Sequence, residues 1–410
     1  MATRELETDA ERSPAGRELY VSRQPVVDGQ MRVSGYRVAY SSGDGTEPGE
    51  ASAARLLGDV LSSVGLDELV GSSLAHLPLP REVLLALGVP PVRPDRVMLR
   101  IPHDTALDAE VASTIDALTG RGYALSLYGL PGPDFDEALL GRFGTVEVDF
   151  ADWDEGDAGV IVSRIKGGRA TALATGLADY DGFEAAKSLG YELFSGPFYA
   201  SRHRARVRKV PVGEMGTLVS LAALQGGSAT IEELEQVIDR DVGLSVKLLR
   251  YINSAYIGMR GSITSIRQAV MMLGSRGVSR WALLVALTGG PSTPRELSVV
   301  GLTRARMCEL LGSERHDVAG DQLFTVGLLS VADALLEVPL ETIVDELPLA
   351  EEVSGALLHR AGPAGSILDA VVSYERGDFD AASLGALTRG VATSYRDALG
   401  WAVETVAALN

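Results

Sequence analysis

The 410-residue chain has a single cysteine, few aromatic residues and no long apolar run. Cys308 therefore has no partner for an intramolecular disulfide, and no group of cysteines exists to hold zinc. No uninterrupted apolar run reaches the roughly 18 residues that a membrane-spanning helix needs. Residues 1–16 are polar and charged and lack the apolar segment of a secretory signal. We therefore expect a protein of the reducing cytoplasm with no bound metal, no cofactor and no membrane anchor.

Positive charge is also scarce, because 37 Lys and Arg residues stand against 55 Asp and Glu residues, a net charge of −18. Proteins that bind nucleic acids need a concentrated positive face, so we do not expect nucleic acid as a partner. The exception is the segment 201–211, which carries five cations within eight residues, four of them arginines: Arg202, Arg204, Arg206 and Arg208. Two interpretations stay open for this segment: a solvated linker that pairs with acidic surfaces, or an anion site at a domain boundary.

Hydrophobic residues at 46% and charged residues at 22% are typical of a globular protein, and two styles of sequence meet near residue 200. Between residues 18 and 200, short apolar runs alternate with helical patterns, which predicts an α/β layout with parallel strands. The pair Asp28-Gly29 lies between two alternating segments and predicts a hairpin. Because the region is shorter than the about 250 residues of an ordinary eight-fold barrel, we expect a trimmed barrel.

From Val212 onward the pattern is helical. Thr230 and Glu233 have the spacing of a capping box, and Gly274 is placed to end a later helix. The chain therefore predicts an α/β part followed by an all-α part. Our boundaries are a disordered tail over residues 1–17, a barrel over 18–200, an Arg-rich linker over 201–212 and a helical domain over 213–410.

Several segments resemble a known family. Arg23-Gln24-Pro25 followed by Gly35-Tyr36, and later Leu189–Phe198, are similar to the EAL domain. Arg240–Ala255 and Ile263–Ala269 resemble the core of the HDOD domain. The order of these segments resembles that of the two-domain EAL–HDOD signalling proteins of bacteria. The resemblance implies a TIM-like EAL barrel joined to a helical HDOD bundle.

The resemblance also implies a site. An active EAL domain hydrolyses cyclic di-GMP with divalent metals held by Glu, Asn and Asp side chains at the strand ends, and hard cations require such oxygen ligands. Arg37 and Arg100 stand where the resemblance implies acidic residues, and Glu147 stands where it implies a lysine. Positive charge at the ligand positions opposes metal binding. We therefore expect a degenerate pocket without catalytic residues. Its aligned positions are Arg37, Pro78, Arg100, Ser126, Leu127, Glu147, Asp149, Thr175, Ala178 and Ser195.

The helical half also contains the dipeptide His316-Asp317, which in HD phosphohydrolases binds metal. No histidine lies between Val210 and Arg315, so the upstream ligand of such an enzyme is absent and we predict a surface dipeptide without metal.

The leading hypothesis is a non-catalytic signal-transduction or scaffold protein whose HDOD half binds an unidentified signalling protein. The alternative is a receptor that binds cyclic di-GMP or a related nucleotide without hydrolysing it, with Arg37 and Arg100 as contacts to phosphate. A residual phosphodiesterase is the third hypothesis. A homodimer through the helical half stays open.

Overall fold

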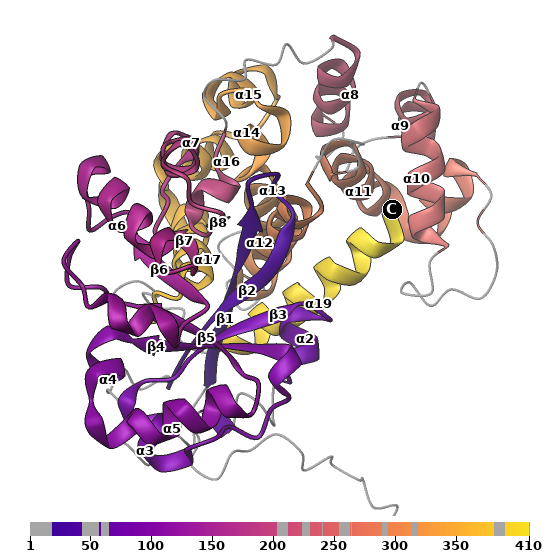
Figure 1. The fold of residues 1–410 in the computed structure, drawn as a ribbon. Helices are drawn as coiled ribbons and strands as arrows, with labels where there is room; N and C mark the ends of the chain where they lie inside the picture. The colour runs from indigo at the N-terminus through magenta and orange to yellow at the C-terminus, as the bar shows by residue number, and fades with distance from the viewer. Residues whose placement is uncertain are drawn as a thin grey trace, which may run out of the picture.

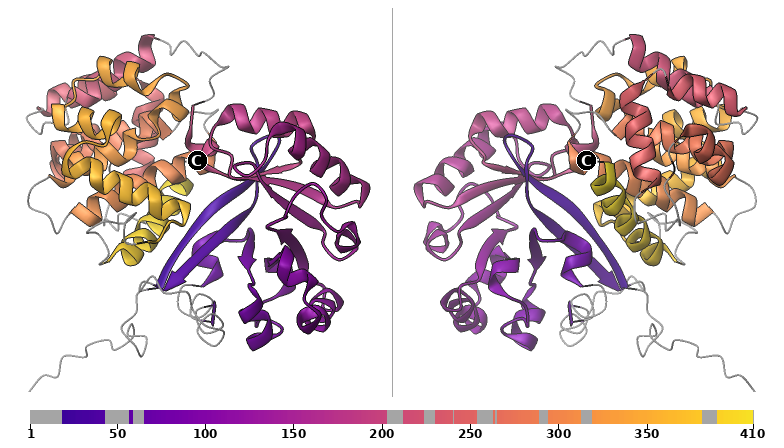
Figure 2. Two further views of the ribbon diagram at one scale, coloured as in Figure 1. Left: turned by 90° about the vertical axis from the view of Figure 1, so that its left-hand side faces the viewer. Right: turned by 90° about the vertical axis from the view of Figure 1, so that its right-hand side faces the viewer.

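The computed structural model describes residues 19–42, 57–58, 65–202, 212–223, 230–239, 241–253, 263, 265–288, 294–312, 319–380 and 390–409. The predicted tail over residues 1–17 lies outside these ranges, as do residues 203–211 of the Arg-rich segment and the dipeptide His316-Asp317. A strand-rich part and a helical part lie side by side, with the first hairpin of the chain between them (Figures 1 and 2).

The strand-rich part is a closed eight-stranded barrel, which confirms the predicted fold class. The first strand runs antiparallel to both of its neighbours, and the remaining pairs are parallel. The strands are β1 (Leu19–Asp28), β2 (Val33–Ser42), β3 (Leu74–Pro78), β4 (Val97–Pro102), β5 (Ala124–Tyr128), β6 (Thr145–Asp149), β7 (Thr171–Thr175) and β8 (Leu193–Phe194).

Short connections explain how so few residues close a barrel. The segment after β5 contains only the 3-10 helix η3 (Glu137–Gly141), and β8 itself has only two residues. The other described helices of the barrel are η2 (Pro94–Arg96), η4 (Pro197–Ala200), α2 (Leu66–Val70), α3 (Arg81–Leu87), α4 (His103–Leu107), α5 (Ala109–Gly120), α6 (Glu155–Gly167) and α7 (Tyr180–Leu189).

The predicted hairpin at Asp28-Gly29 is present between β1 and β2. The Asp28 carboxylate accepts hydrogen bonds from the backbone N–H groups of Gln30 and Arg32, at 2.8 and 3.0 Å, which fixes the turn.

The helical part is a bundle, as the sequence predicted. The capping box is present: the Thr230 hydroxyl accepts the N–H of Glu233, and the Glu233 carboxylate accepts the N–H of Thr230. Its described helices are α8 (Val212–Ala223), α9 (Ile231–Ile238), α10 (Val242–Ile252), α11 (Ile266–Thr288), α12 (Arg295–Gly312), α13 (Gly320–Leu329), α14 (Ala332–Leu336), α15 (Leu340–Glu346), α16 (Glu351–His359), α17 (Gly362–Arg376) and α19 (Val391–Leu409).

Gly274 ends a helical segment, as predicted, and has a φ of 77°, which glycine adopts readily. The range of α11 therefore contains two helical segments, Ile266–Ser275 and Gly277–Thr288, which meet at a bend of 112°.

Among the described helices, no single one is long and apolar enough to cross a bilayer. The two segments Ile266–Ser275 and Gly277–Thr288, taken together as one bent pair, have the length and composition of a membrane span, and nothing else indicates one.

The bundle packs along the part of β1 that the short strand β8 does not reach. β8 pairs with only Val27 and Asp28 of β1, so the first half of β1 has no strand on that side. The hydroxyl of Tyr374 on α17 accepts the N–H of Val21 at 3.0 Å, and the hydroxyl of Tyr395 on α19 accepts the N–H of Arg23 at 3.2 Å. These bonds satisfy backbone donors that would otherwise be buried without a partner, so the docked position of the bundle is part of the fold.

Removing one of these hydroxyls should cost measurable stability. Tyr374 is fully buried, and Tyr374→Phe deletes only the oxygen that accepts the N–H of Val21. We expect a loss of about 1–3 kcal/mol in the free energy of unfolding, because a buried donor is left unsatisfied. Urea denaturation followed by circular dichroism measures it. A midpoint equal to that of the wild type would show that the bond does not contribute.

Candidate functional site

The carboxyl ends of β2 to β8 form the mouth of the barrel, where a buried ion pair lies. Arg100 on β4 donates two hydrogen bonds to Glu147 on β6, with Nε–Oε1 at 2.7 Å and Nη2–Oε2 at 2.8 Å. The hydroxyl of Ser126 on β5 donates to the same carboxylate at 3.0 Å. Arg100 and Glu147 are 7% and 3% exposed, so this bidentate pair is shielded from solvent.

A second guanidinium shares that carboxylate. The Nε of Arg37 on β2 lies 3.6 Å from Oε2 of Glu147 and has no hydrogen-bond partner among the described residues. Burial first, and the nearby Arg100 second, lower the pKa of Arg37 to about 10. Burial alone would raise the pKa of Glu147, but Arg100 and Arg37 outweigh it and lower this pKa to about 2. Two guanidinium groups, one buried (Arg100) and one half-buried (Arg37), therefore face one buried carboxylate.

Asp149 is the second acidic residue of the mouth. It ends β6 and its Oδ1 accepts the N–H of Ala151 at 3.0 Å. Its charge favours the protonated form of Arg37, but no ion pair joins the two side chains among the described contacts. The negative charge of Asp149 therefore compensates the positive charge of Arg37 only partly.

The remaining predicted positions are spread around the mouth. Pro78 ends β3 opposite Arg100 and its carbonyl accepts the Tyr40 hydroxyl at 2.8 Å. Thr175 ends β7 beside Asp149. Ser195 follows β8, fully buried, with an Oγ that has no hydrogen-bond partner among the described residues.

Two predicted positions lie away from this group. Leu127 follows Ser126 on β5 and, by strand alternation, points to the opposite face, where it packs in the core. Ala178 lies after β7 and lines a cavity between the barrel and the bundle. Arg202 is half-buried and close enough to Asp333 to act on its charge, while Arg204, Arg206 and Arg208 lie outside the described residues.

The described residues of the mouth do not form a site for a divalent metal pair. Within the described part of the chain, no three His, Cys, Asp or Glu side chains are grouped so that they could hold a metal ion. Glu147 is already bound by Arg100 and faces Arg37, which leaves Asp149 as the carboxylate that could serve. Hard cations need several converging oxygen ligands, which these residues do not supply.

The sequence contained a signal for the ion pair that was not used. The resemblance implies an acidic residue at position 100 and a lysine at position 147, and the chain has the opposite charge at both. When the charges at two facing positions are both reversed, the two side chains can still form an ion pair, with the acidic and the basic residue in each other's place. His76 was also missed: it lies beside Arg37 on β3, is 1% exposed, and burial lowers its pKa to about 4, so it is a neutral member of the mouth.

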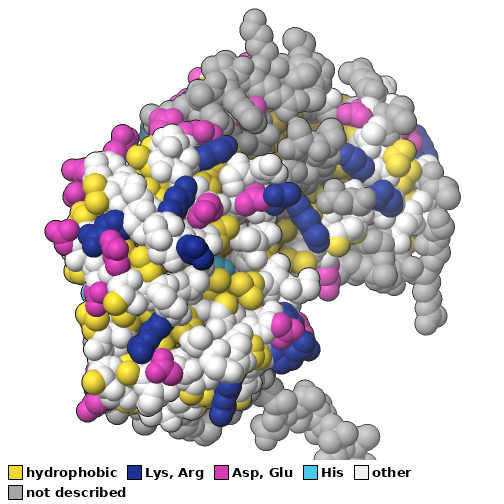
Figure 3. Space-filling view, viewed as in Figure 1, with side chains coloured by type: hydrophobic (Ala, Val, Ile, Leu, Met, Phe, Trp, Pro, Cys, Tyr) yellow, Lys and Arg dark blue, Asp and Glu magenta, His cyan; other side chains and the backbone are white. Residues whose placement is uncertain are grey.

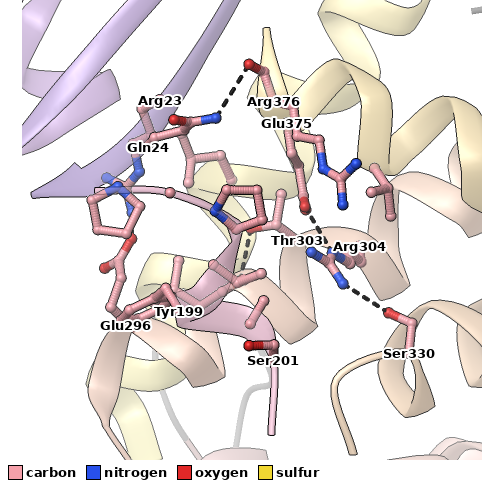
Figure 4. A pocket seen from close by; sticks show the side chains of 18 of the residues that line it. Arg23, Gln24, Tyr199, Ser201, Glu296, Thr303, Arg304, Ser330, Glu375 and Arg376 are labelled. Atoms are coloured by element: carbon pink, nitrogen blue, oxygen red, sulfur yellow. Dashed lines mark hydrogen bonds and ion pairs between the residues drawn. The ribbon is translucent and has the colours of Figure 1, made fainter. Parts of the chain in front are cut away.

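The second candidate site is the cavity between the barrel and the bundle, with a volume of about 280 Å³. Figure 4 shows residues of both parts in its walls. On one wall Arg304 of α12 donates from Nε to Oε2 of Glu375 at 2.7 Å, and its Nη1 lies 3.4 Å from the Ser330 hydroxyl. On the other, Glu296 at the start of α12 accepts from Nη2 of Arg23 at 2.8 Å. No pattern in the sequence joined these residues, because each pair spans many positions.

Together these features define a two-part protein, a closed α/β barrel with an all-α bundle docked along its first strand. Residues 218–336 match the family model of the HDOD domain, so the bundle contains an HDOD domain. With the eight-stranded barrel before it, the resemblance to the EAL–HDOD signalling proteins is confirmed.

Two curated proteins are similar along most of the chain. Cyclic di-GMP phosphodiesterase CdgJ of Vibrio cholerae is 26% identical over 369 residues, which are 88% of this chain and 85% of that protein. The uncharacterized protein YuxH of Bacillus subtilis is 24% identical over 378 residues, 89% of this chain and 92% of that protein. The solved structure of the Bacillus subtilis YkuI protein, which has an EAL domain and holds substrate c-di-GMP and calcium, matches with 12% identity and a TM-score of 0.38 over 62% of this chain and 73% of that one. A similarity this low carries no argument about function.

The prediction that the protein is not an enzyme is contradicted by CdgJ. That relative is named a phosphodiesterase, and its similarity extends through both parts of the chain. The prediction relied on single aligned positions at the strand ends. Such positions show which side chains are replaced. Other groups of a barrel can still catalyse hydrolysis of a phosphodiester, because function depends on the whole site and not on single positions. The replaced side chains of the mouth therefore do not by themselves show that the barrel is inactive.

Proposed function

We propose that this protein is a cyclic di-GMP signalling protein that binds the nucleotide at the barrel mouth through Arg37. The observation that carries the proposal is the sharing of one buried carboxylate, Glu147, by two guanidinium groups. The similarity to CdgJ over 88% of the chain supports the choice of nucleotide.

The two arginines have different roles in this proposal. Arg100 is held by two hydrogen bonds to Glu147 and lies over the ring of Tyr128, 4.7 Å from its centroid, so it is a fixed positioning residue. Arg37 is 22% exposed at its side chain, and its Nε has no hydrogen-bond partner among the described residues. A phosphodiester oxygen would supply the missing acceptor, and charge-assisted bonds of arginine to phosphate are strong.

The surface around the barrel favours a small anion over a nucleic acid. Figure 3 shows acidic and basic side chains interspersed on the visible face, with no broad positive patch. Local cations inside the mouth can bind a dinucleotide, whereas a nucleic acid needs a continuous positive surface. In this proposal the bundle passes the bound state on to a signalling partner.

Replacing Arg37 should remove nucleotide binding. For Arg37→Ala we expect the dissociation constant for cyclic di-GMP to rise by at least tenfold, since a charged hydrogen bond contributes about 1.5–3 kcal/mol. Isothermal titration calorimetry measures the constant. Arg32→Ala is the matched control, because Arg32 is an exposed arginine that pairs with Asp28 in the hairpin.

The same samples should be assayed for conversion of cyclic di-GMP to its linear product, the type of activity for which CdgJ is named. Binding by the wild type that is lost in Arg37→Ala and kept in Arg32→Ala supports the proposal, with or without turnover. Equal binding by the two variants, or no binding by the wild type, would refute it.

A further inference from the structure

The cavity between the barrel and the bundle has the composition of a ligand site. Four arginines and three carboxylates line it: Arg23, Arg304, Arg360, Arg376, Glu296, Asp333 and Glu375. Its volume of about 280 Å³ is close to the lower end of small-molecule pockets, which begin at about 300 Å³. Arg37, Arg100 and Glu147 are not among its lining residues, so it is distinct from the mouth.

Polar groups in its walls lack partners. The Tyr199 hydroxyl and Oε1 of Glu375 are buried and have no hydrogen-bond partner among the described residues. Tyr199 is 4% exposed, and Arg304 and Ser330 are 9% and 8% exposed. Buried polar groups without partners cost free energy, and a ligand that reaches them recovers it.

The charges in the walls indicate the chemistry of the ligand. Arg304 and Arg360 both line the cavity, and each uses its Nε for an ion pair, with Glu375 at 2.7 Å and with Asp369 at 3.1 Å. An anion at their other N–H groups would be stabilised by both charges, which oppose each other. The Tyr199 hydroxyl adds a donor in the same walls, whereas the Ser330 and Thr303 hydroxyls already donate to the carbonyls of Gly327 and Val299. Glu375 supplies a hydrogen-bond acceptor instead: Arg304 binds its Oε2, and its Oε1 can accept from an N–H group of a ligand. The ligand therefore combines an anionic group with an N–H donor.

We propose that this cavity binds a nucleoside monophosphate, with the phosphate at Arg304 and Arg360 and a base N–H at Glu375. Arginine forms paired hydrogen bonds with phosphate oxygens, and a base supplies N–H donors at its edge. The walls come from β1 and η4 of the barrel and from α12 and α17 of the bundle, so the ligand would hold the two parts together. This proposal does not depend on nucleotide binding at the mouth.

Calorimetry on the full chain tests the proposal with four probes: GMP, AMP, guanosine and inorganic phosphate. We expect at least one mononucleotide to bind at a single site, and guanosine and phosphate to bind at least tenfold more weakly, since each makes only part of the contacts. Arg304→Ala should weaken the mononucleotide by at least tenfold. Because that variant leaves Glu375 unpaired, Ala178→Phe is the second test: Ala178 is exposed, lines the cavity, and a larger side chain there fills it.

Arg37→Ala serves as the control, because it alters the mouth and leaves the cavity unchanged. Retained mononucleotide binding in this variant, with loss in Ala178→Phe, supports the cavity site and separates it from the mouth. The proposal is overturned by any of three results: neither mononucleotide binds, phosphate alone binds as tightly as GMP or AMP, or both cavity variants bind as the wild type does.

Discussion

Replacing Glu296 by alanine is expected to uncouple the bundle from the barrel. Glu296 is 8% exposed at the start of α12, and its carboxylate accepts hydrogen bonds from Arg23 at 2.8 Å and from the Tyr36 hydroxyl at 2.7 Å. Arg23 also lies 4.1 Å from the centroid of the Tyr36 ring. Without Glu296 the Arg23 side chain, 6% exposed, is a buried cation with no carboxylate beside it in the described contacts. Breaking a buried pair in this way costs about 3–5 kcal/mol.

Differential scanning calorimetry measures the result. The wild type should unfold in one main transition, because the Glu296 contacts and the tyrosine bonds to β1 couple the two parts. The Glu296→Ala variant should show an earlier transition or a second one. Glu232→Ala is the control: this glutamate also pairs with an arginine, Arg267, but the pair is exposed and within the bundle. An unfolding profile for Glu296→Ala that matches the control would show that the interface does not couple the two parts.

The features predicted correctly from the sequence are local ones. The hairpin at Asp28-Gly29 and the capping box of Thr230 and Glu233 depend on residues a few positions apart, and the structure has both. The alternation of strands and helices predicted the barrel for the same reason. The end of a helical segment at Gly274 is a further local feature that the sequence predicted, because glycine readily adopts the positive φ found there.

The sequence predicted which residues lie at the candidate site, but it did not predict which of them contact one another. The sequence identified three replaced residues, Arg37, Arg100 and Glu147, but they lie on three different strands. Only the closed barrel brings the two arginines to the carboxylate of Glu147. The contact of Arg23 with Glu296 spans 273 positions and depends on how the bundle docks. Neither part alone contains it, so periodicity and motif spacing could not predict it.

Inside the barrel, Glu147→Gln is expected to cause the other large loss of stability. The substitution keeps the size of the side chain but leaves the buried Arg100 and the half-buried Arg37 without their shared carboxylate. We expect the free energy of unfolding at pH 7 to fall by about 3–5 kcal/mol, as when other buried pairs are broken. Guanidinium chloride denaturation measures this loss. Asp95→Asn, in an exposed pair with Arg93, is the control and should leave the midpoint unchanged.

The pH dependence distinguishes a charge effect from a packing effect. The pKa of Glu147 is lowered to about 2 in the folded protein from an ordinary value of 4.5. A carboxylate with a lowered pKa stabilises the fold fully above its unfolded pKa, and this contribution is lost as the pH falls through the folded value. The difference in stability between wild type and Glu147→Gln should therefore be constant from pH 7 to about pH 5 and shrink between pH 4.5 and pH 3. A difference that stays constant down to pH 3 would assign the loss to packing, and the two guanidinium groups would then not depend on the charge of Glu147.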